Sequence, residues 1–347
     1  MRYRQLGNTD LQVSVLGLGT MMFGSWGNPD LQACSDIVNT AIDAGINLID
    51  TADIYDDGRS EEILGRCLAG RRDQVVLATK FGNPMRGDTE QSGGSRRWVL
   101  SAVEESLRRL DTEWIDVYQM HRPDPDTPIE ETLGALDELV QSGKIRAVGT
   151  STFPSEGLEE AQWAAQRAGY ASPSSEQPPY SLLARHIERD VLPTCQRLGI
   201  GVVTWAPLNG GWLTGKYSAS TPPRGSRAER EPEHFDFGSP YHQRKASAVA
   251  GLKNIAQEEG LTLPHLALSF VLEHPAVTSA LVGPRTVEQL GDLLGAENIS
   301  LTAEALDQID DLVKPGETIN MHDAGQAPPE LQPTHRPRNP PNSLPRS

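Results

Sequence analysis

Four residues with complementary acid and base chemistry lie where apolar segments of the chain end: Asp50, Tyr55, Lys80 and His121. Asp50 closes one apolar run, Lys80 and His121 follow the next two, and Tyr55 lies shortly after Asp50. Taken singly, each has an ordinary explanation, since a carboxylate at this place often caps the next helix. Taken together, four titratable groups at successive segment ends predict one shared site with shifted pKa values.

The four side chains suit the protonation of an oxygen atom. A tyrosine hydroxyl has a pKa near 10 and is a poor proton donor at neutral pH, but a neighbouring ammonium favours its phenolate. Lys80 can supply that ammonium, and the Asp50 carboxylate would keep it charged and fixed. His121 can donate a hydrogen bond to an oxygen in the same pocket.

The elements that must position these residues repeat along the chain as apolar run, polar loop and amphipathic helix. The runs predict eight buried strands, at 15–19, 46–50, 75–79, 114–120, 145–149, 174–177, 200–205 and 278–283. Apolar residues spaced for helices occupy 30–45, 96–110, 129–143 and 161–169. This order, without a G-x-G-x-x-G after the first strand, predicts one (β/α)8 TIM barrel rather than an open dinucleotide-binding sheet. The strand ends of such a barrel meet at one face, where active sites lie.

Several segments fall outside this repeat. Residues 2–15 predict a small hairpin that acts as a lid or plug, and 217–243 form a polar insertion of the kind found in functional lids or disordered loops. We place the barrel domain at residues 1–315. Residues 316–347 form a Pro-rich C-terminal extension, expected to be extended or disordered. Within the barrel, Ser60 is expected to cap the helix after Tyr55.

Composition excludes several classes of protein. The net charge is −16 with no basic patch, which disfavours nucleic acid and acidic membrane surfaces as partners. The chain shows no signal sequence and no apolar run of membrane-spanning length. Cys34, Cys67 and Cys195 lie far apart without metal-ligand spacing, so we expect no metal site and no disulfide framework. A soluble protein of a reducing compartment, the cytoplasm, is predicted.

The chain resembles the aldo-keto reductases. NLIDTADIYDDGRSEEILG, ATKFG, WIDVYQMHRPD, GKIRAVGTSTF, GVVTWAPLNGGWLTGKY and LVGPRTVEQL are similar to that family's signature blocks, in the family's order. The resemblance implies an oxidoreductase that binds NADP(H) and reduces aldehyde or ketone carbonyls to alcohols by hydride transfer from nicotinamide C4. By motif, it implies Asp50, Tyr55, Lys80 and His121 as the catalytic tetrad, with Tyr55 as general acid.

The cofactor residues are argued partly from type. Trp205 offers a surface on which nicotinamide can stack, and Ser151 and Gln177 offer partners for its carboxamide. Arg285, near the start of the last helix of the repeat, can pair with a 2′-phosphate, which favours NADP(H) over NAD(H). Thr152 stands where the family very often has Asn. The resemblance adds Gly19, Thr20, Met21, Asp50, Thr152, Pro207, Leu208, Gly210, Lys216, Gly283 and Gln289 to the cofactor-binding set.

The substrate is expected to be a small carbonyl compound of unspecified identity, with Phe23 and Trp26 as candidate apolar walls of its pocket. Two other functions stay open. The family also resembles potassium-channel β subunits, so a cofactor-bound regulatory protein is the first alternative. The second is a cofactor-free lyase or isomerase that uses Tyr55, Lys80 and His121 as acid and base. A homo-oligomer is possible.

Overall fold

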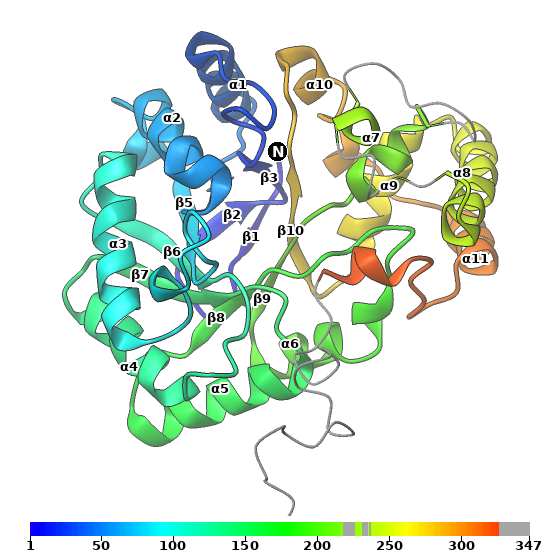
Figure 1. The fold of residues 1–347 in the computed structure, drawn as a ribbon. Helices are drawn as coiled ribbons and strands as arrows, with labels where there is room; N and C mark the ends of the chain where they lie inside the picture. The colour runs from blue at the N-terminus through cyan, green and yellow to red at the C-terminus, as the bar shows by residue number, and fades with distance from the viewer. Residues whose placement is uncertain (218–225, 231–234, 236, 326–347) are drawn as a thin grey trace, which may run out of the picture.

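The computed structural model describes residues 1–217, 226–230, 235 and 237–325. Eight parallel strands close into a barrel in the order β10-β3-β4-β5-β6-β7-β8-β9, which confirms the predicted TIM barrel (Figure 1). The strands are β3 Leu16–Gly19, β4 Leu48–Asp50, β5 Val76–Phe81, β6 Ile115–Met120, β7 Ile145–Thr150, β8 Pro173–Glu176, β9 Gly201–Thr204 and β10 Val277–Val282. Each matches one predicted apolar run. β5 extends two residues beyond the prediction, so Lys80 lies inside the strand rather than after it.

Helices cover the outside of the barrel, as Figure 1 shows. They are α1 Leu31–Asp43, α2 Arg59–Cys67, α3 Arg96–Leu110, α4 Ile129–Gln141, α5 Ser155–Ala168, α6 Val191–Leu198, α7 Arg227–Arg230, α8 Pro240–Glu258, α9 Leu263–Glu273, α10 Val287–Gly291 and α11 Ala303–Leu312. Their ends follow local sequence. The Asp30 side chain accepts from Ala33 N at the start of α1, and Gly169, in a left-handed conformation, ends α5.

The start of α2 differs from the prediction. Its N-cap is Gly58, whose φ of 92° is left-handed, and Ser60 lies inside the helix. The Ser60 hydroxyl donates to the carbonyl of Thr20 at 2.8 Å and lies 3.1 Å from the Thr51 hydroxyl. The expectation that Ser60 caps the helix is therefore wrong. Its side chain instead ties the helix to the loops after β3 and β4.

The N-terminal hairpin closes the bottom of the barrel. Strands β1 Tyr3–Gln5 and β2 Gln12–Ser14 pair antiparallel. Leu6 and Val13 are buried in one cluster with residues from the barrel strands, including Leu48, Val76 and Val203. Of the two predicted roles, lid or plug, the hairpin has the plug position, because it packs at the N-terminal ends of the strands, opposite the face where the predicted site residues lie.

Parts of the insertion and of the C-terminal extension pack on the barrel. Within 217–243, the rings of Phe235 and Phe237 lie 6.4 and 5.7 Å from that of Trp212, while residues 218–225, 231–234 and 236 lie outside the described residues. In the extension, Ile319 N donates to the carbonyl of Leu183 at 3.1 Å. Residues 326–347 lie outside the described part of the chain.

The three cysteines are buried and free. None of the helices in the described ranges combines the length and apolar character that crossing a bilayer requires.

The hairpin turn predicts a stability effect. A Cβ on Gly7, whose φ is +54°, would lie 2.2 Å from the carbonyl oxygen of Ser174 and 2.8 Å from Gly201 N. Gly7→Ala is expected to lower the free energy of unfolding by about 3 kcal/mol, from left-handed strain plus backbone overlap. Gly70→Ala is the matched control, because Gly70 is also left-handed (φ +76°) with nothing within 4 Å. It should cost only about 1 kcal/mol. Urea unfolding measures both, and equal losses would contradict a tightly seated plug.

Candidate active site

A buried ion pair forms the centre of the site. Lys80 Nζ lies 2.5 Å from Asp50 Oδ1 and donates to the carbonyl of Thr51 at 2.7 Å. Lys80 is fully buried and Asp50 is 2% exposed. Strand register brings them together, because Asp50 of β4 pairs with Ala78 of β5. Lys80 is the next residue after Ala78 whose side chain points to the same face of β5. Two charges buried in a protein interior must be neutralised by each other and by hydrogen bonds.

Two glutamines complete the environment of Asp50. Gln119 Nε2 donates to Asp50 Oδ2 at 3.1 Å, and Gln177 Nε2 donates to the same oxygen at 2.8 Å. Sequence reasoning did not single out Gln119. The signal in the sequence was a polar residue inside a fully buried strand, because such a residue needs a polar partner. In the structure, Gln119 of β6 pairs with Lys80 of β5.

Tyr55 and His121 lie against this pair. Lys80 Nζ is 5.2 Å from the centroid of the Tyr55 ring, and the Tyr55 and His121 rings meet edge to face at 5.9 Å. The structure thus brings all four sequence-predicted residues to one place. His121 N donates to the carbonyl of Phe81 at 2.8 Å, which fixes the histidine backbone at the end of β6.

Burial and charge shift the pKa values of these groups. Burial raises the pKa of Tyr55 above 10, although the Lys80 ammonium pulls it downward. Burial alone would lower the pKa of Lys80, but Asp50 and Tyr55 together raise it, so the ammonium is retained. Burial and then the Lys80 charge hold the pKa of His121 well below 6.5. At neutral pH the site therefore holds a phenol, an ammonium and a neutral imidazole.

The loop after β3 is fastened beside Tyr55. Asp56 accepts from Ser25 N at 2.8 Å and from the Ser25 hydroxyl, and its own φ of 50° is left-handed. A Cβ on Gly24 would lie 2.3 Å from Asp56 Oδ2, so only glycine fits there. This contact places the Trp26 ring 6.3 Å from that of Tyr55, with Trp26 45% exposed. Trp26 is therefore positioned to form a pocket wall, whereas the other candidate wall, Phe23, is fully buried in the hydrophobic core.

The predicted carboxamide partners lie together at the ends of β7 and β8. The Ser151 hydroxyl donates to the carbonyl of Gln177 at 2.9 Å, and Thr152 N donates to the same carbonyl at 3.2 Å. Thr152 has a φ of 59°, which is strained for a β-branched residue and is tolerated far better by Asn. Its buried hydroxyl oxygen has no hydrogen-bond partner among the described residues.

Trp205 follows β9 and is partly buried. The C-terminal segment reaches it, because a Cβ on Gly325 would lie 3.3 Å from Trp205 Cζ2 and 2.8 Å from Thr152 Cγ2. An ion pair of 2.5 Å between Lys245 and Asp323 fastens that segment. Residues 316–325 thus border the same region as the predicted nicotinamide residues.

The other residues of the predicted cofactor-binding set lie at or after the ends of β9, β10 and β3. After β9, Pro207, Leu208, Gly210 and Lys216 belong to a turn in which Ala206, Asn209, Gly210 and Gly211 all have positive φ. After β10, Gly283 packs on Gly19, since a Cβ there would be 3.7 Å from the Gly19 carbonyl oxygen.

The remaining members of this set hold their loops in place. Arg285 N donates to Gln289 Oε1 at 2.9 Å, so the Gln289 side chain holds the start of α10. Thr20 N donates to the carbonyl of Asp50 at 2.9 Å, and Met21 follows it at the mouth of the barrel.

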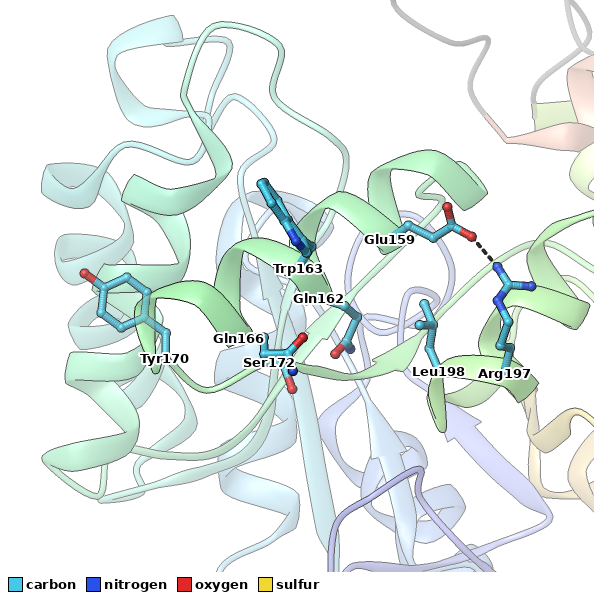
Figure 2. A pocket seen from close by; sticks show the side chains of 8 residues that line it. All are labelled: Glu159, Gln162, Trp163, Gln166, Tyr170, Ser172, Arg197 and Leu198. Carbon is cyan, nitrogen blue, oxygen red and sulfur yellow. Dashed lines mark hydrogen bonds and ion pairs between the residues drawn. The ribbon is translucent and has the colours of Figure 1, made fainter.

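The hollow drawn in Figure 2 is separate from this site. It lies on the outer surface beside α5 and α6, and its lining includes Trp163, Gln162 and Arg197 but no tetrad residue. Within the described residues, no group of three or more His, Cys, Asp or Glu is arranged to hold a metal ion.

A second buried cluster of charged side chains, formed by Glu61, Arg109 and Asp53, lies next to the loop that carries Tyr55. Arg109 Nε lies 2.6 Å from Glu61 Oε2, and the Thr79 hydroxyl donates to Glu61 Oε1 at 2.6 Å. Asp53 is 1% exposed, and neither of its carboxylate oxygens has a hydrogen-bond partner among the described residues. Burial, and then the charge of Glu61, raise the pKa of Asp53 well above its usual value. Arg109 pairs with Glu61, whereas Asp53 has no ion pair among the described residues.

Comparison with known proteins agrees with this geometry. The Aldo/keto reductase family model matches residues 15–314. The chain is 38% identical over 323 residues to the uncharacterized oxidoreductase YrpG of Bacillus subtilis, covering 90% of this chain and 96% of that protein. It is 36% identical over 309 residues to the aldo-keto reductase YhdN of the same organism, covering 88% and 91%. It is 36% identical over 326 residues to a probable voltage-gated potassium channel subunit beta of Arabidopsis thaliana, covering 90% and 97%.

The raised pKa of Asp53 predicts a pH-dependent gain in stability when this carboxyl group is replaced. Because its pKa is raised on folding, the folded state binds the extra proton and loses stability as pH rises above the unfolded value. Asp53→Asn removes this cost, so the variant should be more stable than the parent at pH 8. The gain should shrink toward pH 4, by at most about 1.4 kcal/mol per pH unit. The exposed Asp57→Asn in the same loop is the control. A gain independent of pH, measured by urea unfolding, would contradict a protonated Asp53.

Proposed function

The chain belongs to the aldo/keto reductase family, whose members are oxidoreductases of carbonyl compounds, and we propose that it reduces aldehydes or ketones to alcohols with NADPH. The observation that carries the proposal is the convergence of Asp50, Lys80, Tyr55 and His121 around one buried ion pair. This set can deliver a proton to a carbonyl oxygen without water. The substrate is a small carbonyl compound.

The chain's own residues fit a nicotinamide cofactor. Trp205 offers a partly exposed ring, and the unpartnered Thr152 hydroxyl, with Ser151 and Gln177, offers polar partners for a carboxamide. When bound, the cofactor supplies the hydride that adds to the carbonyl carbon. Arg285 would pair with a 2′-phosphate, which is why we propose NADPH rather than NADH.

Tyr55 acts as the general acid. Its raised pKa keeps the hydroxyl protonated at neutral pH, so a proton is available when charge develops on the substrate oxygen. The proton moves from the Tyr55 hydroxyl to that oxygen, and the phenolate left behind is stabilised by the Lys80 ammonium. Asp50, held by Gln119 and Gln177, keeps Lys80 charged and in place.

His121 orients the carbonyl. Since burial and Lys80 hold its pKa well below 6.5, the imidazole is neutral and can donate only one hydrogen bond. A neutral donor can bind the carbonyl oxygen without competing with Tyr55 as the proton source. The free, buried cysteines agree with a reducing compartment, and we propose the cytoplasm as the location.

A regulatory role is the second candidate, favoured by the similarity to proteins named as potassium channel β subunits in Arabidopsis and rice, at 36% and 35% identity. The two functions are compatible, since a binding subunit can retain a cofactor site. Cofactor binding without turnover of any aldehyde or ketone would favour this candidate over the enzyme.

The general-acid role predicts the effect of removing one oxygen atom. Tyr55→Phe should lower kcat for aldehyde reduction by about 10²- to 10⁴-fold, the usual contribution of a general acid, with NADPH affinity nearly unchanged. NADPH oxidation followed by absorbance measures the turnover. Tyr241→Phe, at an exposed position on α8, is the matched control and should leave kcat unaltered. Full turnover in Tyr55→Phe would remove the assignment.

The cofactor preference predicts a selective loss. Arg285→Gln should raise the Kd for NADPH by about 10- to 100-fold, since one charged pair to the 2′-phosphate is lost, and should change the Kd for NADH less than about threefold. Arg66→Gln, a change at an exposed position of α2, controls for the loss of one positive charge. Fluorescence titration gives both constants, and equal losses for the two cofactors would contradict a 2′-phosphate contact.

A further inference from the structure

Arg122 directly follows His121 and lies at the same face of the barrel. Its Nη1 donates to the carbonyl of His121 at 2.5 Å and lies 3.4 Å from the Ser151 hydroxyl. Both contacts use one nitrogen of the guanidinium. Among the described residues, Nε and Nη2 have no hydrogen-bond partner, and neither is sealed from solvent. The guanidinium is thus held through Nη1, while Nε and Nη2 are accessible to solvent.

The charge of Arg122 is not neutralised by any ion pair within the described ranges. The other largely buried arginines differ, because Arg72, Arg109 and Arg185 each pair with a carboxylate. A half-buried guanidinium that has no carboxylate partner keeps its charge available to a bound anion. Arg122 therefore differs from these three arginines in having no carboxylate partner in the described part of the chain.

Glu176 does not supply the missing charge. Its two oxygens already accept from the Thr150 hydroxyl at 2.5 Å and from Phe153 N at 3.1 Å. Burial raises the pKa of Glu176 to about 7, so the carboxyl group is only partly ionised at neutral pH. No ion pair joins it to Arg122 in the described structure.

Arg122 is within electrostatic reach of the reacting atoms. Its charge lowers the pKa of Tyr55, against the larger raising effect of burial, and lowers that of His121 in the same direction as burial. Those two residues flank the place where a carbonyl oxygen would bind. A guanidinium presents paired N–H groups that match a carboxylate, and a chain of net charge −16 otherwise repels anions.

We propose that Arg122 binds a carboxylate on the substrate, so that the preferred substrates are aldehydes or ketones that also carry a carboxylate group. This inference rests on the proposed reduction of carbonyls. The contact between Arg122 and the substrate carboxylate would position the substrate beside Tyr55 and His121, and it defines the substrate class. The carboxylate of the substrate would occupy the open side of the guanidinium while the carbonyl oxygen faces Tyr55 and His121.

The test compares two substrates that share the benzaldehyde ring and differ in the para group, 4-carboxybenzaldehyde with a charged carboxylate and its neutral methyl ester. The parent protein should reduce the acid with the higher kcat/KM. Arg122→Met should lower kcat/KM for the acid by about 10- to 100-fold, mainly through KM, and change that for the ester less than about threefold. Arg122→Lys should retain part of the preference, since an ammonium keeps the charge but not the paired geometry. Arg66→Met controls for net charge.

Other outcomes are distinguishable. Equal losses for acid and ester in Arg122→Met would overturn the proposal and indicate general stabilisation of charge at the carbonyl oxygen. A loss of NADPH affinity would overturn it in favour of a contact to the cofactor. If the parent protein reduces neither compound, the proposed function fails, and calorimetry with benzoate tests Arg122 directly. Benzoate binding that disappears in Arg122→Met supports the anion site, and no binding to the parent overturns it.

Discussion

The buried pair of Asp50 and Lys80 is the constraint on which the rest of the candidate active site depends. Its two charges are stable in the barrel only because they lie 2.5 Å apart with further hydrogen bonds from Gln119 and Gln177. These four side chains come from β4, β5, β6 and the end of β8. Their contacts therefore hold only if the strands keep one register, since a slip of one residue would turn each side chain to the opposite face. The chemistry and the barrel register are specified by the same contacts.

Local strain is concentrated in the loops that follow the strands. Seven described residues other than glycine have positive φ, and one of them, Asp111, merely ends α3. The other six lie in loops after strands: Asp56, Asp57, Arg86, Thr152, Ala206 and Asn209. Such conformations persist only where surrounding contacts enforce them, as the Ser25 bonds do for Asp56. The barrel is the rigid scaffold, and the strained turns orient side chains at the C-terminal ends of its strands.

Sequence patterns predicted the elements better than the contacts between them. The eight strands were found because buried parallel strands are continuous apolar runs, and even the polar run at 174–177 corresponds to β8. The convergence of Asp50, Tyr55, Lys80 and His121 could be predicted because these residues end or follow such runs, and their catalytic role stays a proposal. The sequence did not single out Gln119, because its role depends on Asp50 on another strand. It did not single out Asp53 or Arg122 either, because what distinguishes them is the lack of an ion-pair partner in the described structure, which no local pattern predicts. The prediction for Ser60 was wrong because the helix begins earlier: the left-handed Gly58 is its N-cap, so Ser60 lies inside α2.

The closure of the barrel has a consequence for how the chain folds. β10 pairs with β3, Ala280 opposite Leu16, and Arg4 donates to the carbonyls of Val277 and Leu272. The first and last strands of the barrel must therefore meet across nearly the whole length of the domain. Contacts of such wide sequence separation slow folding, and until they form the facing edges of β3 and β10 are unpaired. The time between synthesis and closure is thus the period in which this protein is most exposed to aggregation.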